Sequence, residues 1–152
     1  PVVLEDKAKD WFEINNQKSP YMLFVYKIKK KHLLTHTKNI EKEGFEKLND
    51  LRSKIPAVTH VDNSARVQTI NRSSNKALYD LIVKFEKKTN CPILVNTSFN
   101  VRGEPIVNAP SDAFKCFMGT DLDVLVIGNF YLTKKNQKTE LILDYKNKCN
   151  PD

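Results

Sequence analysis

The chain has 152 residues, 40% of them hydrophobic and 28% charged, which is the composition of one globular domain with a real core. No apolar run approaches the ~18 residues of a membrane-spanning helix, and no secretory signal pattern opens the chain, so we expect a cytoplasmic protein without membrane contact. The net charge of +7 is spread along the chain rather than clustered, which argues against nucleic-acid binding.

The first half of the chain predicts helices and strands in alternation. A first helix is indicated by helical spacing of Leu4, Ala8, Trp11 and Phe12. Residues 19–29, "SPYMLFVYKIK", are rich in aromatic and β-branched side chains and predict a strand. Residues 38–52 predict a highly charged helix. Residues 56–70, "PAVTHVDNSARVQTI", predict two short strands around a turn at Asp62, Asn63 and Ser64.

The second half predicts a layered arrangement. Asn75 is the expected N-cap of a helix that places Leu78, Ile82 and Phe85 on one face. Residues 92–96 predict a buried strand, and a short helix is expected from Pro110 to Gly119. Residues 123–132, "DVLVIGNFYL", predict one further apolar strand. This alternation predicts an α/β fold: a mixed twisted sheet with helices on its faces.

The cysteines predict core positions rather than chemistry. Cys91, Cys116 and Cys149 have no CxxC spacing, so neither a zinc site nor a disulfide framework is expected, and a reduced setting fits best. Cys91 and Cys116 stand in apolar surroundings, where a buried thiol acts as a small hydrophobic side chain.

A polar cluster follows the predicted strand at 92–96. Loops at strand ends are where α/β sheets bind ligands, and Gly103 lets the backbone approach one closely. Hydroxyl, amide and guanidinium groups that suit phosphate oxygens lie together here: Asn96, Thr97, Ser98, Asn100 and Arg102. The alternative is an ordinary turn in which Asn and Ser side chains cap backbone groups.

A second polar cluster lies within 56–70 and contains His60, Asp62, Arg66 and Gln68. Only four of the 25 basic residues are arginine, so an arginine in such a motif suggests a need for its planar, two-pronged hydrogen bonding. Arg52 and Arg72 are interpreted as ordinary surface residues. His60 is either a site residue or a histidine satisfied by its neighbours, and no third ligand accompanies His60 and Asp62 to support a metal site.

These two motifs carry a resemblance. "PAVTHVDNSARVQTI" and "CPILVNTSFNVRGEPIVNAPSDAFKCFMGTDLDVLVIGNF" resemble the C-terminal, YrdC-like domain of the NodU/CmcH/TobZ carbamoyltransferase family. The match covers about residues 56–132, and 19–25 match more loosely. Residues 1–135 are therefore expected to form this domain, as a fragment of a longer two-domain enzyme, with a polar, lysine-rich tail at 136–152.

The resemblance implies a chemistry. It implies that the C-terminal domain makes carbamoyl-adenylate from carbamoyl phosphate and ATP, with Mg²⁺ held mainly by the nucleotide. An N-terminal actin-like domain, where iron or another metal is expected, then transfers the carbamoyl group to a hydroxyl acceptor. Arg66 would hold a phosphate, and Ser98 and Asn100 would contact the nucleotide. The resemblance also implies that His60 is a second catalytic residue and that Arg102 contacts the nucleotide.

Two other functions would account for parts of the sequence. A threonylcarbamoyl-AMP synthase would share the Ser98-Phe99-Asn100 motif, but the K-x-R signature expected early in such a chain is absent. A basic module that binds nucleic acid would use the net charge alone. The expected partners are carbamoyl phosphate, ATP and the actin-like domain, and a homodimer is left open.

Overall fold

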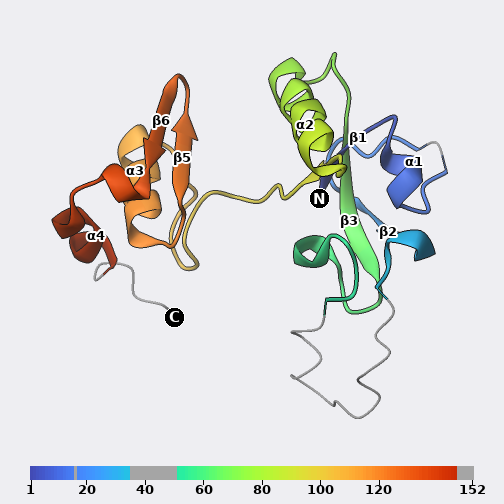
Figure 1. Cartoon of the computed structure of the whole chain (residues 1–152), viewed down its shortest axis with the longest axis horizontal. Helices are drawn as coiled ribbons and strands as arrows, with labels where there is room; N and C mark the ends of the chain where they lie inside the picture. Colours follow the sequence, from blue (N-terminus) through green and yellow to red (C-terminus); the bar gives the residue numbers. More distant parts are fainter. Residues whose placement is uncertain (16, 35–50, 147–152) are drawn as a thin grey trace, which may run out of the picture. The chain divides into compact units, whose positions relative to one another are not determined.

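The computed structural model describes residues 1–15, 17–34 and 51–146 (Figure 1). They form two units, Pro1–Asn96 and Thr97–Asp152, which are described separately below. The helix predicted over 38–52 lies almost wholly outside the described residues, as does Cys149.

Unit 1 is built on a four-stranded sheet with strand order β2-β3-β1-β4. β1 (Val2–Leu4) pairs in parallel with β3 (Ser64–Ile70), so that Val2 lies opposite Gln68. β2 (Phe24–Lys27) is antiparallel to β3, and β4 (Ile93–Leu94) is antiparallel to β1. The prediction of a mixed sheet with helices is confirmed, and the YrdC-like label stays a prediction.

Successive residues of each strand face opposite sides of this sheet, and each side has its own core. On one side Val3, Ala65 and Val67 pack with the helix α1 (Ala8–Trp11) and its neighbours. On the other side Val2, Leu4 and Ile70 pack against the long helix α2 (Lys76–Thr89), whose Ile82 is fully buried. Helices therefore cover both faces, and α2 begins as predicted, with the Asn75 side chain accepting from the Leu78 N–H at 3.0 Å.

Several elements at the start of the chain differ from the predictions. Leu4 was expected in the first helix but lies in β1, because burial at the centre of the sheet outweighs helical spacing. The strand expected over 19–29 is shorter, and Lys30–His32 form the 3₁₀ helix η1. The first of the two strands expected in 56–70 is instead the 3₁₀ helix η3 (Pro56–Val58), since Pro56 has no N–H for a ladder.

Unit 2 packs two helices and a β-hairpin around its own core. α3 (Pro110–Gly119) starts and ends where predicted, and its Phe117 and Met118 are fully buried. The single strand expected over 123–132 is a hairpin of β5 (Val124–Ile127) and β6 (Phe130–Thr133). The turn residue Gly128 has φ +56°, a left-handed conformation that glycine adopts without strain.

The segment after the hairpin was expected to be a polar tail. It contains the 3₁₀ helix η4 (Lys134–Asn136) and then α4 (Thr139–Lys146). Apolar side chains of α4 pack against the α3 and β5 core, among them Leu141, Ile142 and Tyr145. The division of the chain at 135/136 stays a prediction from composition.

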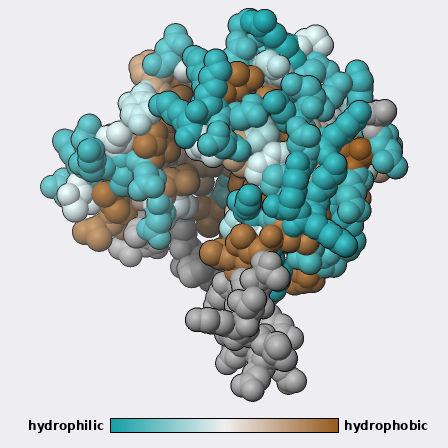
Figure 2. Space-filling view, turned by 45° about the vertical axis from the view of Figure 1, so that its right-hand side comes forward, coloured by the Kyte–Doolittle hydropathy of each residue, from teal (hydrophilic) through white to brown (hydrophobic). Residues whose placement is uncertain are grey.

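The cysteines lie in or against these cores. Cys116 is buried in α3, and Cys91 packs at the edge of the α1-side core, where burial raises the pKa of its thiol. Figure 2 shows a face dominated by hydrophilic side chains with smaller apolar patches. Apolar side chains are exposed along the edge strand β2 and the segment before it, namely Tyr21, Leu23 and Val25. No helix among the described residues has the length and apolar character to cross a membrane.

Candidate functional site

Arg66 projects from the middle of β3 on the α2 side of the sheet. Its neighbours Ala65 and Val67 are fully buried on the opposite side, while Arg66 itself is exposed beside Val25 of β2. Within the part of the chain that the structure describes, its guanidinium makes no hydrogen bond or ion pair. Arg66 is thus a cation available to a ligand.

Gln68 and Asn96 lie on this same side of the sheet and bind each other. The Asn96 Nδ2 donates to Gln68 Oε1 at 2.6 Å, and Gln68 Nε2 donates to the Pro20 carbonyl at 2.9 Å. These bonds fix the orientation of both amides, so the start of the polar loop is tied to the strand that carries Arg66. Gln68 was not predicted as a site residue. Its position two residues after Arg66, which puts both on one face of a strand, was the available signal.

Asp62 lies in the turn before β3, as predicted, and His60 precedes that turn without belonging to a strand. The Asp62 carboxylate accepts hydrogen bonds from Lys27 Nζ at 2.8 Å and from the Ser64 hydroxyl at 2.5 Å. These bonds hold the pKa of Asp62 well below its usual range. Because Ser64 donates to Asp62, the His60 Nδ1 must donate to the Ser64 oxygen, 3.0 Å away. The turn therefore orients His60, which is an exposed residue.

Arg66 and Asp62 form no ion pair, and the Asp62 carboxylate is instead contacted by Lys27 Nζ at 2.8 Å. Among the described residues, no group of three or more His, Cys, Asp or Glu side chains is placed to hold a metal ion.

The polar loop of unit 2 is organised by Asn100. Its Nδ2 donates to the carbonyls of Val101 and Glu104, at 3.1 and 3.0 Å, and closes a turn in which Gly103 has φ +83°. The backbone bond from Val107 N–H to the Phe99 carbonyl, 2.9 Å long, closes the wider loop. Asn100 thus has the turn-capping role that was the alternative for this cluster, and its Oδ1 remains outside these bonds.

Other members of the loop are exposed. Thr97, Ser98 and Arg102 have exposed side chains, and none of the three makes a side-chain hydrogen bond or ion pair within the described ranges. Unit 1 thus holds Arg66, His60 and Asn96, and unit 2 holds the rest of the predicted site. That all of them serve one ligand stays a prediction.

Sequence reasoning missed a pocket of about 520 Å³ in unit 1, at the carboxyl ends of β1 and β3. It is lined in part by Arg72, which was interpreted as an ordinary surface residue. Only the pairing of β1 with β3 reveals it, because the two strands are more than 50 residues apart in the chain.

Comparison with known proteins identifies the family. The family described as Carbamoyltransferase C-terminus matches residues 1–134, which include β1 to β6 and both polar clusters. The chain belongs to this family. The carbamoyltransferase resemblance stated from the two motifs is therefore confirmed.

Relatives of this family member are much longer proteins. An uncharacterized protein of Synechocystis is 52% identical over 138 residues, which are 90% of this chain and 22% of that protein. Nodulation protein NolO of Bradyrhizobium diazoefficiens is 39% identical over 137 residues, 89% of this chain and 22% of that protein. Nodulation protein NolNO of Sinorhizobium fredii is 38% identical over 142 residues, which are 92% of this chain and 18% of that protein. The chain thus spans about a fifth of the length of the curated relatives it matches.

Proposed function

We propose that this chain is the part of an O-carbamoyltransferase that activates the carbamoyl group as carbamoyl-adenylate. The observation that carries the proposal is the family match over residues 1–134. The exposed and unpaired guanidinium of Arg66 adds support, because it lies on a face of the sheet and within the segment 56–70 that carries the family resemblance. Transfer to a hydroxyl acceptor would be the work of an actin-like domain of the same protein.

The reaction balances with one water molecule. Water cleaves carbamoyl phosphate to carbamate and inorganic phosphate, and a carbamate oxygen then attacks the α-phosphorus of ATP. The bond to the β-phosphate breaks, so pyrophosphate leaves and carbamoyl-adenylate forms. Such transfers depend on positioning and on stabilising the charge of phosphate oxygens rather than on a protein nucleophile. Mg²⁺ would enter bound to the phosphates of ATP.

The residues of the two clusters have separate roles in this proposal. Arg66 would hold a phosphate through two parallel hydrogen bonds, which its lack of protein partners leaves possible. The exposed hydroxyls of Thr97 and Ser98 and the charge of Arg102 would contact the nucleotide phosphates. Asn100 would act mainly by shaping the turn, through its bonds to the carbonyls of Val101 and Glu104.

The direct test is exchange of labelled pyrophosphate into ATP by the full-length protein. We expect exchange that depends on carbamoyl phosphate, and only weak ligand binding without turnover by residues 1–152 alone. Exchange that requires threonine and bicarbonate instead of carbamoyl phosphate would assign the domain to threonylcarbamoyl-adenylate synthesis. Robust carbamoylation of an acceptor by residues 1–152 alone would contradict the division of labour between domains.

A further inference from the structure

The pocket of unit 1 lies where the chain leaves the two adjacent parallel strands β1 and β3 toward opposite faces of the sheet. After β1 the chain enters α1, which packs with Val3 and Val67 on one face. After β3 it enters α2, which packs with Val2 and Ile70 on the other. Such a divergence opens a crevice beyond the carboxyl ends of the strands, and α/β sheets bind small molecules in that crevice. The pocket of about 520 Å³ lies there, and its size suits a metabolite.

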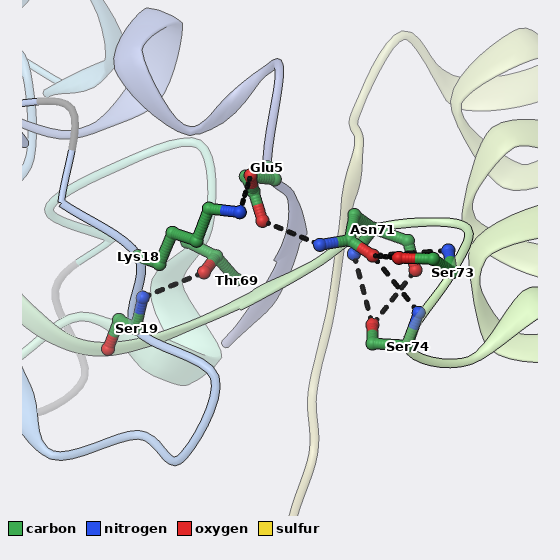
Figure 3. A network of polar contacts seen from close by, with 7 residues as sticks. All are labelled: Glu5, Lys18, Ser19, Thr69, Asn71, Ser73 and Ser74. Atoms are coloured by element: carbon green, nitrogen blue, oxygen red, sulfur yellow. Dashed lines mark hydrogen bonds and ion pairs between the residues drawn. The ribbon is translucent and has the colours of Figure 1, made fainter.

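Its walls are held in place by a polar network (Figure 3). Glu5, directly after β1, lies between Lys18 at 3.4 Å and the Asn71 Nδ2 at 3.0 Å, so both its oxygens are occupied. Ser19 is buried and anchors the segment that carries Lys18, because its N–H donates to Thr69 Oγ1 at 2.9 Å and its hydroxyl to the Val67 carbonyl at 2.7 Å. The pocket is therefore preformed.

The β3–α2 loop offers side chains rather than backbone donors to this pocket. Asn71 Oδ1 accepts from the N–H groups of Ser73 and Ser74, at 3.1 and 3.0 Å, and from the Ser73 hydroxyl at 2.7 Å. Because these two N–H groups already donate to Asn71 Oδ1, they are not available to a ligand in the pocket. The Arg72 side chain is held only loosely, with its Nε 3.7 Å from an Asp80 carboxylate that Lys76 contacts at 2.7 Å.

The groups left available define the ligand. Lys9 and Asp6 make no side-chain hydrogen bond or ion pair within the described part of the chain, and both line the pocket with Arg72 and Tyr79. Arg72 and Lys9 can only donate hydrogen bonds and attract an anion, whereas the Asp6 carboxylate can only accept. A ligand that satisfies both carries an anionic group and hydroxyl donors.

We propose that this pocket binds a phosphorylated sugar, either free or as part of a nucleotide. The phosphate would meet Arg72 and Lys9, and sugar hydroxyls would donate to Asp6. A free amino acid also carries both charges but would fill only a small part of the volume. This site is separate from the proposed adenylation site, because Arg66 lies four residues before the end of β3, about 13 Å along the strand.

The test uses amide NMR spectra of the 152-residue chain with ribose 5-phosphate as the probe. We expect shifts confined to residues 5–9, 17–19 and 69–79, with an affinity about tenfold or more above those for ribose or inorganic phosphate alone. Arg72→Gln should weaken binding about tenfold or more. Asp6→Asn should bring the affinity down toward that for inorganic phosphate. Arg52→Lys, outside the pocket, is the control.

Titration with AMP separates the two sources of the sugar phosphate. Tighter binding of AMP than of ribose 5-phosphate assigns a nucleotide, and equal binding assigns the free sugar phosphate. No shifts, equal shifts with inorganic phosphate alone, or the same shifts with glycine would overturn the proposal. So would shifts centred on Arg66 that Arg66→Lys removes and Arg72→Gln does not. None of these outcomes depends on carbamoyl phosphate, so this site and the proposed function stand or fall separately.

Discussion

Gln68 is expected to tie the start of the polar loop to β3, and this can be measured as a coupling energy. Gln68→Met keeps the length of the side chain but removes its bonds to Asn96 and to the Pro20 carbonyl. Each neutral hydrogen bond contributes about 0.5–1.5 kcal/mol. Because Gln68 is half-buried and Asn96 is exposed, we expect a total loss of about 1–2 kcal/mol in the unfolding free energy of unit 1.

The assay is urea unfolding followed by fluorescence of Trp11. This is the only tryptophan of the chain and is buried in unit 1, so it reports the unfolding of that unit. A double-mutant cycle with Asn96→Ala isolates the bond between the two amides, for which we expect a coupling of about 0.5–1.5 kcal/mol. If the losses in unfolding free energy from Gln68→Met and Asn96→Ala add within about 0.3 kcal/mol in the double variant, the two amides are not coupled and the prediction is refuted.

Three further outcomes test local features. Burial lowers the pKa of His32, which stacks on Trp11, below its ordinary value of 6.5. The unfolded chain then takes up this proton first, so unit 1 should lose stability below about pH 6.5, and His32→Phe should reduce this loss in the same fluorescence assay. Asn75→Ala should cost about 1 kcal/mol by leaving the Leu78 N–H uncapped, while Asn75→Asp, in the same urea assay, should cost little. Gly128→Ala meets no atom within 4 Å, so its expected cost of about 1–2 kcal/mol, measured by hydrogen exchange in the hairpin, reflects the positive φ alone.

The elements that sequence predicted well are those with local signals. Asn75 caps α2, and α3 begins at Pro110 and ends at Gly119. Each of these residues acts on backbone groups within one helical turn of itself. β1 was missed because Val2–Leu4 form a strand only through their partners in β3 and β4. The hairpin turn at Gly128 had a local signal, a Gly-Asn pair between two short apolar runs, which was not recognised.

The candidate site divides in the same way. The exposed position of Arg66 follows from strand alternation, and the sequence motif singled it out. The part of Asn100 in closing its own turn is also local, and it was foreseen as an alternative. Arg72 is exposed, as expected, but the pocket that it lines was not visible in the sequence, because that pocket requires β1 to lie beside β3 and their helices to leave to opposite faces. No pattern within a short segment encodes that adjacency.

The central claim is that Arg66 clamps a phosphate during carbamoyl-adenylate formation, and one substitution in the full-length protein tests it. Arg66→Lys keeps the charge but loses the two parallel hydrogen bonds. We expect carbamoyl-phosphate-dependent pyrophosphate exchange to fall by about 10²–10³-fold, the scale for losing one donor to a transition state. Arg52→Lys, the same change outside both clusters, should leave exchange unchanged. Near-normal exchange by a folded Arg66→Lys protein, with folding checked by circular dichroism, would contradict the account and move the phosphate clamp to Arg102.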